Sequence, residues 1–384
     1  MFTKAELREK GAKRLTLEYI ASQDPSIPVP ENVGEEHIRE GVIVRSNHWR
    51  EIDGFEGVFE SVELGENHSL ILGSYTINSV EEAINFIRLQ PTGNSELDQF
   101  LARRTTFFRE YCDAKALDPE EVLSELQILP QKKVESKYSG LIAEHPNKEH
   151  RYFLYFQPKS IGFVVDVLPT GKRLIDVQIA SESKFSMEQL MGFADIQQDT
   201  IYEIVDLYRR VMSLEKYAKD DGVHAMEFTA QPNCVLQTRV FRKKDRTKTE
   251  CSWKKEKGVI KTNFAFGSTP AEGITLPLFR IEPVYGNQPF SEKYKEHERI
   301  SKDHPHGFGY WLCTGDVYLG TYIPNIEAAV ASTFPSYCNH GGMDNCSNIP
   351  LVLFNTRGTI TNRRLKQGKH ITFFAGNGVG YIKV

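Results

Sequence analysis

The sequence contains little cysteine, and its cysteines form no regular framework. Six cysteines are spread over 384 residues, and no pair has C-x-x-C spacing. Small domains held together by disulfides need a denser and more regular pattern. We therefore expect reduced thiols.

The chain also lacks a long hydrophobic run and a strong excess of one charge. No apolar run approaches the roughly 18 residues that are needed to cross a bilayer. The N-terminus, MFTKAELREKGAKR, is charged where a secretory signal would be apolar. The formal net charge is -4, so no global field attracts nucleic acid or an anionic membrane. These absences predict a cytoplasmic protein without a membrane partner, whose recognition depends on a local site.

What the sequence does contain is enough apolar material for several cores. Hydrophobic residues make up 40% of the chain and aromatic residues 11%, which at this length is typical of two or three globular domains. A capping box of Thr3 and Glu6 predicts a first helix that reaches about residue 21. Two β-branched or apolar runs, 41–47 and 69–75, predict strands.

Helix-like and strand-like segments follow in the middle of the chain. A capping pair begins the stretch 78–90 and predicts a helix, and a second helix is expected over 95–111. Strand-like segments separated by Asn, Pro and Gly turns occupy 137–180. The amphipathic stretch 199–220 has a continuous apolar stripe, which predicts a helix packed on a sheet.

The segments HAMEFTA and CVLQTRV predict an antiparallel hairpin with its turn at 231–233. Successive side chains of a strand point to opposite faces of its sheet. One face of the hairpin is therefore apolar and comprises Met226, Phe228, Leu236 and Val240. The other face comprises Ala225, Glu227, Gln237 and Arg239. The second face has two interpretations. It is either a solvated surface or a metal and phosphate site, because hard oxygen ligands suit Mg²⁺ and a guanidinium suits phosphate.

The stretch 242–257, RKKDRTKTECSWKKEK, is strongly basic and contains Trp253. Nucleic-acid binding is one interpretation. We favour a solvated edge hairpin or connector, because lysines discourage edge pairing and no second nucleic-acid element is present. The last unit begins near residue 306. It contains a helix-like segment at 325–334 and a Gly-Asn-Gly stretch at 376–380 that predicts a hairpin turn.

Taken in order, these motifs resemble the ATP-grasp nucleotide-binding domain and the swivelling phosphohistidine domain of phosphoenolpyruvate synthase and pyruvate phosphate dikinase. The similarity covers most of 8–242 and about 306–384. KGAKRLTLEYI with IPVP resembles the family's G-G-K loop, helix and V-P, and puts Lys13 at an ATP-contacting lysine. VIVRSN with GFEGVFES resembles V-R-S-S and S-F-A-G, and puts Arg45 at the arginine that meets the nucleotide phosphates.

Two further segments extend this resemblance. PQKKVESKYSGLIAEHP resembles the pattern after the adenine-binding region, with Gln131 at its start as a cofactor-binding residue. MEFTAQPNCVLQTR resembles the closing D-x-E and L-Q-x-R hairpin, which implies Glu227 and Gln237 as metal ligands and Arg239 on the terminal phosphates. Ala225 replaces the Asp of D-x-E, which leaves one carboxylate fewer near the metal.

The stretch CNHGGMDNCSNIP, 338–350, corresponds in this resemblance to the phosphohistidine loop G-G-x-x-S-H-A. Cys346 stands at the position of the phosphohistidine. His340 is therefore a candidate phosphoryl acceptor or general base, and Cys346 a candidate thiolate nucleophile. Two alternatives stay open. Cys338, His340 and Cys346 could bind zinc, although their spacing is unlike paired C-x-x-C ligands and no fourth ligand is evident, or neither side chain reacts.

The sequence thus predicts an α+β or α/β protein. An ATP-grasp-like domain is expected over 1–242, a basic connector over 243–305 and a swivelling β/β/α-type domain over 306–384. The resemblance implies an ATP- and Mg²⁺-dependent phosphotransferase that acts on a small-molecule acceptor, for which no motif names the acceptor or the oligomeric state. The alternative is a regulatory protein that binds nucleotide without turnover.

Overall fold

The computed structural model describes most of the chain. The described residues are 2–52, 59, 61–69, 73–114, 116–145, 147, 152–157, 163–167, 173–179, 198–244, 247–262, 265–281, 299–312, 326–331, 349–353 and 365–384. The chain divides into two compact units. The described part of the first unit lies within Met1–Ser136 and Cys234–Arg239. The second unit comprises Lys137–Asn233, Val240–Pro283 and His297–Val384. The predicted domain limits remain predictions.

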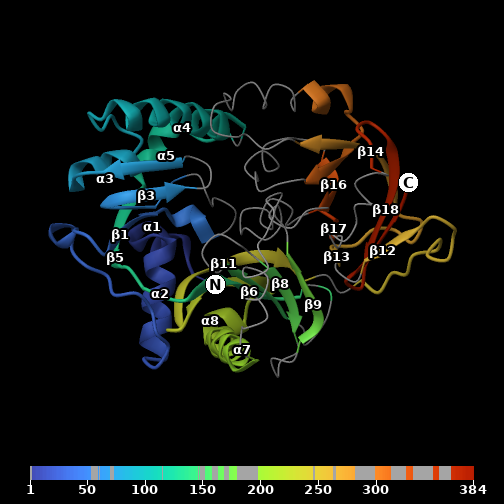
Figure 1. Ribbon diagram of the computed structural model, residues 1–384, viewed down its shortest axis with the longest axis horizontal. Helices are drawn as coiled ribbons and strands as arrows, with labels where there is room; N and C mark the ends of the chain where they lie inside the picture. Colours follow the sequence, from blue (N-terminus) through green and yellow to red (C-terminus); the bar gives the residue numbers. More distant parts are fainter. Residues whose placement is uncertain are drawn as a thin grey trace. The chain divides into compact units, whose positions relative to one another are not determined.

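The first unit contains two small sheets and a group of helices (Figure 1). Its helices are α1 (Lys4–Lys10), α2 (Ala12–Gln23), α3 (Val80–Ile87), α4 (Ser95–Ala114) and α5 (Pro119–Ser124), with 3-10 turns η1 (Glu35–His37) and η2 (Trp49–Ile52). Strands β1 (Val42–Asn47), β2 (Val62–Glu63) and β5 (Gln127–Lys132) form a sheet in the order β2-β1-β5, and β3 (Gly65–Ser69) pairs with β4 (Gly73–Ile77).

Several local predictions for the first unit are confirmed, and two need correction. Thr3 and Glu6 form the expected capping box, and the Ser79 side chain accepts from the backbone of the third residue of α3. The first helix, however, is interrupted at Gly11, which separates α1 from α2. The predicted single strand over 69–75 is also wrong, because Ser69 pairs antiparallel with Gly73 in the hairpin of β3 and β4.

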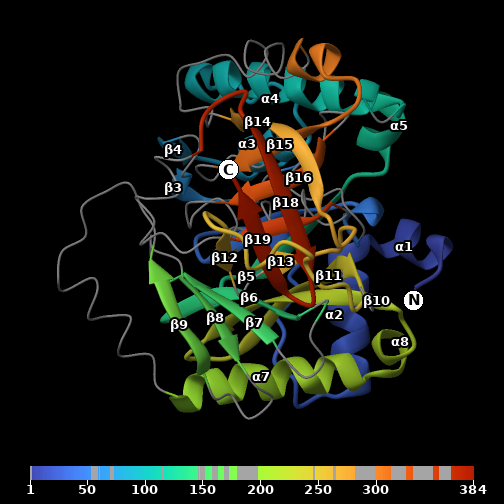
Figure 2. The same ribbon diagram turned by 90° about the vertical axis from the view of Figure 1, so that its right-hand side faces the viewer.

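The second unit begins with an antiparallel sheet backed by a helix. The strands of this sheet are β6 (Tyr138–Glu144), β7 (Tyr152–Gln157), β8 (Phe163–Val167), β9 (Arg173–Ile179), β10 (Gly222–Ala230) and β11 (Cys234–Lys243), in the order β11-β10-β6-β7-β8-β9. Residues Cys234–Arg239 of β11 belong to the first unit. Helix α7 (Gln198–Ser213) packs on β6 and β10 and is followed by α8 (Glu215–Ala218); Figure 2 shows α7 along one face of the sheet. The amphipathic helix and the hairpin around 231–233 are confirmed.

An eight-stranded mixed sheet completes the second unit. It comprises β12 (Ile260–Thr262), β13 (Ala265–Phe266), β14 (Ile274–Ile281), β15 (Phe308–Leu312), β16 (Ile326–Ala331), β17 (Leu351–Leu353), β18 (His370–Gly376) and β19 (Val379–Lys383). Their order is β12-β19-β18-β14-β15-β16-β17-β13. The predicted hairpin turn is confirmed at Asn377–Gly378, where both residues have positive φ. The predicted helix over 325–334 is wrong, because β16 lies there and pairs in parallel with β15 and β17.

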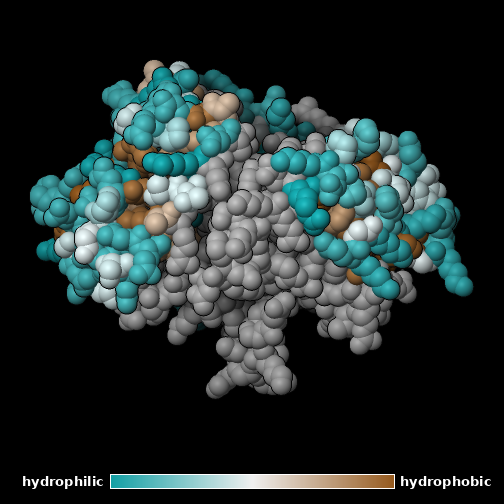
Figure 3. All heavy atoms as spheres, turned by 90° about the horizontal axis from the view of Figure 1, so that it is seen from above, coloured by the Kyte–Doolittle hydropathy of each residue, from teal (hydrophilic) through white to brown (hydrophobic). Residues whose placement is uncertain are grey.

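Strands from the predicted basic connector are part of this sheet. β12 and β13 form its two edges, and β14 lies inside it between β18 and β15. The buried side chains Leu278, Ala328 and Phe373 belong to one apolar cluster that spans the sheet. On the visible face of the described residues, hydrophilic side chains predominate and hydrophobic ones form small separate groups (Figure 3). The described chain is therefore a mixed α+β protein whose apolar side chains are mostly buried.

The two sheets of the second unit are joined by polar and aromatic contacts. Arg242, at the end of β11, donates to the carbonyl oxygen of Ile349 (3.0 Å) and lies over the ring of Phe266 (5.3 Å). Asn147 Nδ2 donates to the carbonyl oxygen of Gly267 (3.2 Å). These contacts connect the sheet of β6–β11 to the segments around β13 and β17 in the eight-stranded sheet.

Candidate functional site

Arg45 lies at the centre of a polar network in the first unit. Its Nη1 donates to Gln131 Oε1 (3.2 Å) and to the carbonyl oxygen of Leu236 (2.9 Å), and its Nη2 donates to Gln237 Oε1 (3.0 Å). Strand β1 supplies Arg45, β5 supplies Gln131 and β11 supplies Gln237. Acceptors from two other strands therefore hold the guanidinium and fix the plane of its fork.

The register of β1 and β5 explains why Arg45 and Gln131 meet. Ile43 pairs with Gln131 in the antiparallel ladder, so Arg45 and Gln131 are diagonal neighbours on one face. Gln131 is buried, and its Nε2 donates to Asn32 Oδ1 (2.9 Å). The first unit thus brings together Arg45, Gln131 and Gln237, which the sequence assigned to nucleotide and metal binding. Their roles remain predictions.

Lys13 is part of a separate buried ion pair. Its ammonium donates to the carbonyl oxygen of Ser46 (2.7 Å) and to Ser46 Oγ (3.1 Å), and it lies 2.8 Å from Glu51 Oε2. Ser46 Oγ donates in turn to Glu51 Oε1 (3.1 Å). The side chains of Lys13 and Glu51 are 9% and 3% exposed. Two hydrogen bonds to Ser46 and an ion pair with Glu51 therefore hold the ammonium.

Lys13 and Arg45 do not converge on a common point. Ser46 follows Arg45 directly on β1, and consecutive side chains of a strand point to opposite faces. The Lys13 ammonium is bound to Ser46 Oγ, so it lies across the strand from the Arg45 guanidinium. The two cations that the resemblance places on one triphosphate are therefore separated by β1 in this structure.

Asn47, the last residue of β1, occupies the N-terminus of α2. Its Oδ1 accepts from the backbone N–H groups of Lys13 (3.0 Å) and Arg14 (3.4 Å), and its Nδ2 donates to the carbonyl oxygen of Lys10 (2.7 Å). Gly11 makes this approach possible, because it has a φ of +72° and a Cβ there would lie 2.2 Å from Asn47 Nδ2. The glycine of the segment that resembles the G-G-K loop thus permits a contact within the protein.

His48 continues this buried polar region. Its imidazole is fully buried, with Nε2 3.8 Å from Glu125 Oε2, and it stacks on Trp49 with 6.0 Å between ring centroids. Burial lowers the pKa of His48 to about 4, although the charge of Glu125 opposes the shift. The ring is therefore neutral at pH 7.

The hairpin residues predicted to bind metal and phosphate are not solvated. Gln237 is 4% exposed and Arg239 only 2%, whereas Leu236 and Val240, expected on the apolar face, are half-buried. The solvated-surface interpretation of the polar face is therefore wrong for these two residues. Glu227 is half-buried on β10 and belongs to the second unit, whereas Gln237 and Arg239 belong to the first.

Other candidate residues lie outside the part of the chain that the structure describes. Cys338, His340 and Cys346 all fall within 332–348. The phosphoryl-acceptor, nucleophile and zinc interpretations of that loop therefore remain predictions. Ile349, the first described residue after 348, is the residue whose carbonyl oxygen accepts from Arg242.

The described residues do not form a ready metal site around Gln237. Within the described ranges, no group of three or more His, Cys, Asp or Glu side chains could hold a metal ion. Gln237 Oε1 accepts from Arg45, and a cationic guanidinium at that distance opposes a second cation on the same oxygen. The metal-ligand roles of Gln237 and of Glu227 remain predictions.

Sequence reasoning missed three residues that organise this region. Ser46 and Glu51 bind the Lys13 ammonium, and Asn47 caps α2. A signal for two of them was present, because Ser46 and Asn47 directly follow Arg45 in VIVRSN. No local pattern marks Glu51, whose role depends on how α2 packs beside η2.

The basic stretch does not expose its aromatic residue. Trp253 is 7% exposed, belongs to a buried cluster with Cys251 and Phe374, and donates through Nε1 to the carbonyl oxygen of Glu272 (2.8 Å). Stacking on a nucleic-acid base requires an open ring face. The Trp253 ring is used in the core of the second unit.

Comparison with known proteins does not place the chain in a family. No model of a known protein family matches the sequence, and no curated protein matches it either. Among the helices of the described residues, none combines the length and the apolar composition that a membrane crossing requires.

Proposed function

We propose that this protein is an ATP- and Mg²⁺-dependent phosphotransferase that acts on a small-molecule acceptor. The observation that carries the proposal is the network of Arg45, Gln131 and Gln237. These residues come from three motifs far apart in the sequence, and each was assigned to the nucleotide site from its motif alone. A guanidinium oriented by fixed acceptors is suited to the bidentate recognition of phosphate oxygens.

Phosphoryl transfer depends mainly on positioning and on neutralising charge. Arg45 would contact the nucleotide phosphates, while Gln131 and Gln237 would hold its fork in place. Arg239, being buried, would contribute positive charge behind the site more readily than a direct contact. MgATP would bring its own metal, for which Glu227 is the proposed carboxylate ligand, whereas Gln237 Oε1, which accepts from Arg45, would orient the guanidinium. When bound, the metal would neutralise part of the negative charge of the phosphate groups.

The same proposal includes the finer fold assignment. The first unit with the antiparallel sheet of β6–β11 corresponds to an ATP-grasp-like nucleotide domain, and the sheet of β12–β19 to the swivelling domain. Two features support this correspondence. The strands are antiparallel with α7 packed on them, and the hairpin of β10 and β11 lies at one edge of the sheet. His340 and Cys346 are the residues proposed for the acceptor step.

A second candidate function is nucleotide-dependent regulation without turnover. The observation that favours it is the Lys13 ammonium, which is held by hydrogen bonds to Ser46 and by an ion pair with Glu51. Ala225 in place of a carboxylate points the same way. In this form the protein would bind nucleotide through Arg45 and leave it intact.

One experiment separates these functions. The purified protein is incubated with Mg²⁺ and ATP, with and without a pool of cellular metabolites, and the products are resolved by phosphorus NMR. ADP that forms only with metabolites supports a direct kinase, whereas AMP with phosphate supports a dikinase-like route through His340. ATP that binds but stays intact supports regulation. Absence of any thermal stabilisation by millimolar MgATP would overturn both.

The matched variants are Arg45→Lys and Arg88→Lys. The first retains a positive charge but loses the fork that three acceptors hold, so it should weaken MgATP binding on the order of tenfold or more. Arg88 is exposed at the end of α3, so its substitution should leave binding unchanged. Equal effects of the two variants would remove Arg45 from the site.

A further inference from the structure

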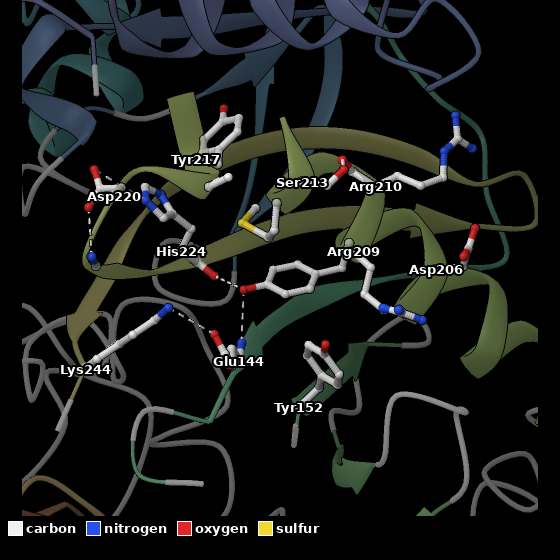
Figure 4. Close-up of a pocket in the computed structure, with 14 residues that line it drawn as sticks. Glu144, Tyr152, Asp206, Arg209, Arg210, Ser213, Tyr217, Asp220, His224 and Lys244 are labelled. Atoms are coloured by element: carbon white, nitrogen blue, oxygen red, sulfur yellow. Dashed lines mark hydrogen bonds and ion pairs between the residues drawn. The ribbon is translucent and has the colours of Figure 1, made fainter. Parts of the chain in front are cut away.

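A pocket of about 590 Å³ opens in the second unit, on the side of the antiparallel sheet that carries α7 and α8. Residues of α7 and α8, the ends of β6, β7 and β10, and the segment after β11 line it (Figure 4). None of the residues proposed for nucleotide, metal or acceptor binding contributes to its lining. Its volume lies in the range of small-molecule binding sites.

The charges around this pocket are balanced. Three acidic and three basic side chains line it: Glu144, Asp206, Asp220, Arg209, Arg210 and Lys244. An anion or a cation alone would therefore meet as many like charges as opposite ones. A ligand that carries both signs, with its charges separated along its length, would be complementary to such a lining.

The inner end of the pocket contains buried polar atoms whose hydrogen-bonding capacity is not used. Asp220 Oδ2 lies 3.7 Å from His224 Nε2, and the two side chains are 5% and 7% exposed. Asp220 Oδ2 and both ring nitrogens of His224 have no hydrogen-bond partner among the residues described. A separation of 3.7 Å is too long for a direct hydrogen bond, and each unsatisfied buried group is costly.

The surroundings hold this pair in place. Asp220 Oδ1 accepts from the backbone N–H of Gly222 (2.8 Å), which leaves Oδ2 directed to His224. The Tyr217 ring packs edge-on against the imidazole at 5.2 Å. Tyr208 fixes the strand, because its hydroxyl donates to the His224 carbonyl oxygen (2.7 Å) and accepts from the Glu144 backbone N–H (3.1 Å). The pair is therefore a built feature of the fold.

We propose that this pocket binds a zwitterionic ligand, a free amino acid or a short peptide, whose ammonium lies between Asp220 and His224 and whose carboxylate is met by Lys244 and Arg209. Lys244 lies 3.6 Å from Glu144 Oε2 and is 38% exposed, so it can exchange this partner for a ligand carboxylate. Arg209 lies on the other side of the pocket from Asp220 (Figure 4). The proposal is independent of the nucleotide site.

An ammonium matches the inner end because it has three donors and no acceptor. Asp220 Oδ2 is an acceptor, and His224 Nε2 is one when the ring proton is on Nδ1. Burial lowers the pKa of His224, against the opposing charge of Asp220 and with the charge of Lys244 adding to the shift. A neutral ring at pH 7 can therefore accept a hydrogen bond, which a protonated ring could not.

The test measures binding in the absence of ATP, so its failure is distinct from failure of the proposed kinase. The full-length protein is titrated with free phenylalanine, Phe-Gly and Phe-Gly-Gly by calorimetry, because tyrosine rings line the pocket and the series changes the distance between the two charges. We expect saturable binding of at least one probe. Tighter binding of the amino acid or of a peptide identifies the source of the ligand, and no binding by any probe at millimolar concentration overturns the proposal.

Ligand derivatives test the assignment without altering the protein. N-acetylation removes the ammonium, and C-terminal amidation removes the carboxylate. Acetylation of the best probe should lower its affinity on the order of 10- to 100-fold, because it removes a charged hydrogen bond at a buried site. Undiminished binding of the acetylated probe would refute the ammonium site.

Variants locate the two ends. Asp220→Asn retains an oxygen for Gly222 but replaces Oδ2 with a donor, so it should lower affinity on the order of 10- to 100-fold. Lys244→Met should lower it more modestly, on the order of severalfold, because its site is partly exposed. Lys254→Met, which removes a comparable surface pair with Glu250 away from the pocket, should change nothing. Wild-type affinity in Asp220→Asn would overturn the assignment.

Discussion

Replacing Lys13 with methionine should destabilise the first unit strongly. Glu51 is 3% exposed, and the Lys13 ammonium is the cation that lies 2.8 Å from its carboxylate. Removing one partner of a buried ion pair costs roughly 3–5 kcal/mol, because the other charge is left buried without compensation. The Ser46 oxygens would also lose a donor. Urea unfolding followed by circular dichroism would measure the loss of free energy of unfolding.

The double variant Lys13→Met, Glu51→Gln separates this structural role from nucleotide binding. A neutral glutamine can still accept from Ser46 Oγ, which now binds Glu51 Oε1, so the double variant should recover on the order of 2 kcal/mol of the loss. We expect it to be stabilised by MgATP to the same extent as the wild type. A cost below about 1 kcal/mol for the single variant would refute the buried-pair reasoning. Loss of the MgATP effect in a stable double variant would establish Lys13 as a nucleotide contact.

Three other predictions concern stability. Burial holds the pKa of His48 near 4, whereas a histidine in an unfolded chain has a pKa near 6.5. Between these two pH values the unfolded chain binds a proton that the folded protein does not bind. The free energy of unfolding should therefore fall by about 3 kcal/mol from pH 7 to pH 4, relative to the variant His48→Gln. Gly11→Ala should cost roughly 2–4 kcal/mol, because its Cβ would meet Asn47, while Gly41→Ala, also at positive φ but with open space around it, should cost only about 1 kcal/mol; equal unfolding midpoints would contradict this. Trp253→Ala should lower the free energy of unfolding by about 3–5 kcal/mol, measured by thermal unfolding, because the ring is buried. For the same reason it should leave any retention of the protein on a nucleic-acid column unchanged.

The fold could be predicted from the sequence where the deciding signal was local. Capping at Thr3, the turn after Ala230 and the turn at Asn377 depend on a few neighbouring residues, and all three are found. The segment 325–334 could not be assigned this way, because a short apolar, alanine-rich run fits a buried helix or a buried strand equally well. Parallel pairing with β15 and β17 decided it, and those partners are distant in the sequence.

The candidate site was predictable to a similar extent. Motif order singled out Arg45, Gln131 and Gln237, which the first unit brings into one network. Alternation along a strand also indicates which side chains share a face, but it does not say whether that face is covered. For this reason the burial of Arg239 could not be predicted. The ion pair between Lys13 and Glu51 could not be predicted either, because it forms only when η2 packs beside α2.

The separation of Lys13 from Arg45 by β1 constrains how this unit could use a nucleotide. A phosphate at Arg45 would lie on the Gln131 side of the strand, whereas Lys13 is held on the Ser46 side by three oxygens. Moving Lys13 to the phosphate would leave the Glu51 carboxylate buried without its cation, at a cost of several kcal/mol. Arg45, by contrast, only exchanges a neutral acceptor for a charged phosphate oxygen, and the stronger hydrogen bond favours phosphate binding. Phosphate recognition in this fold should therefore depend on the guanidinium, with the Lys13–Glu51 pair fixing the end of β1 against α2.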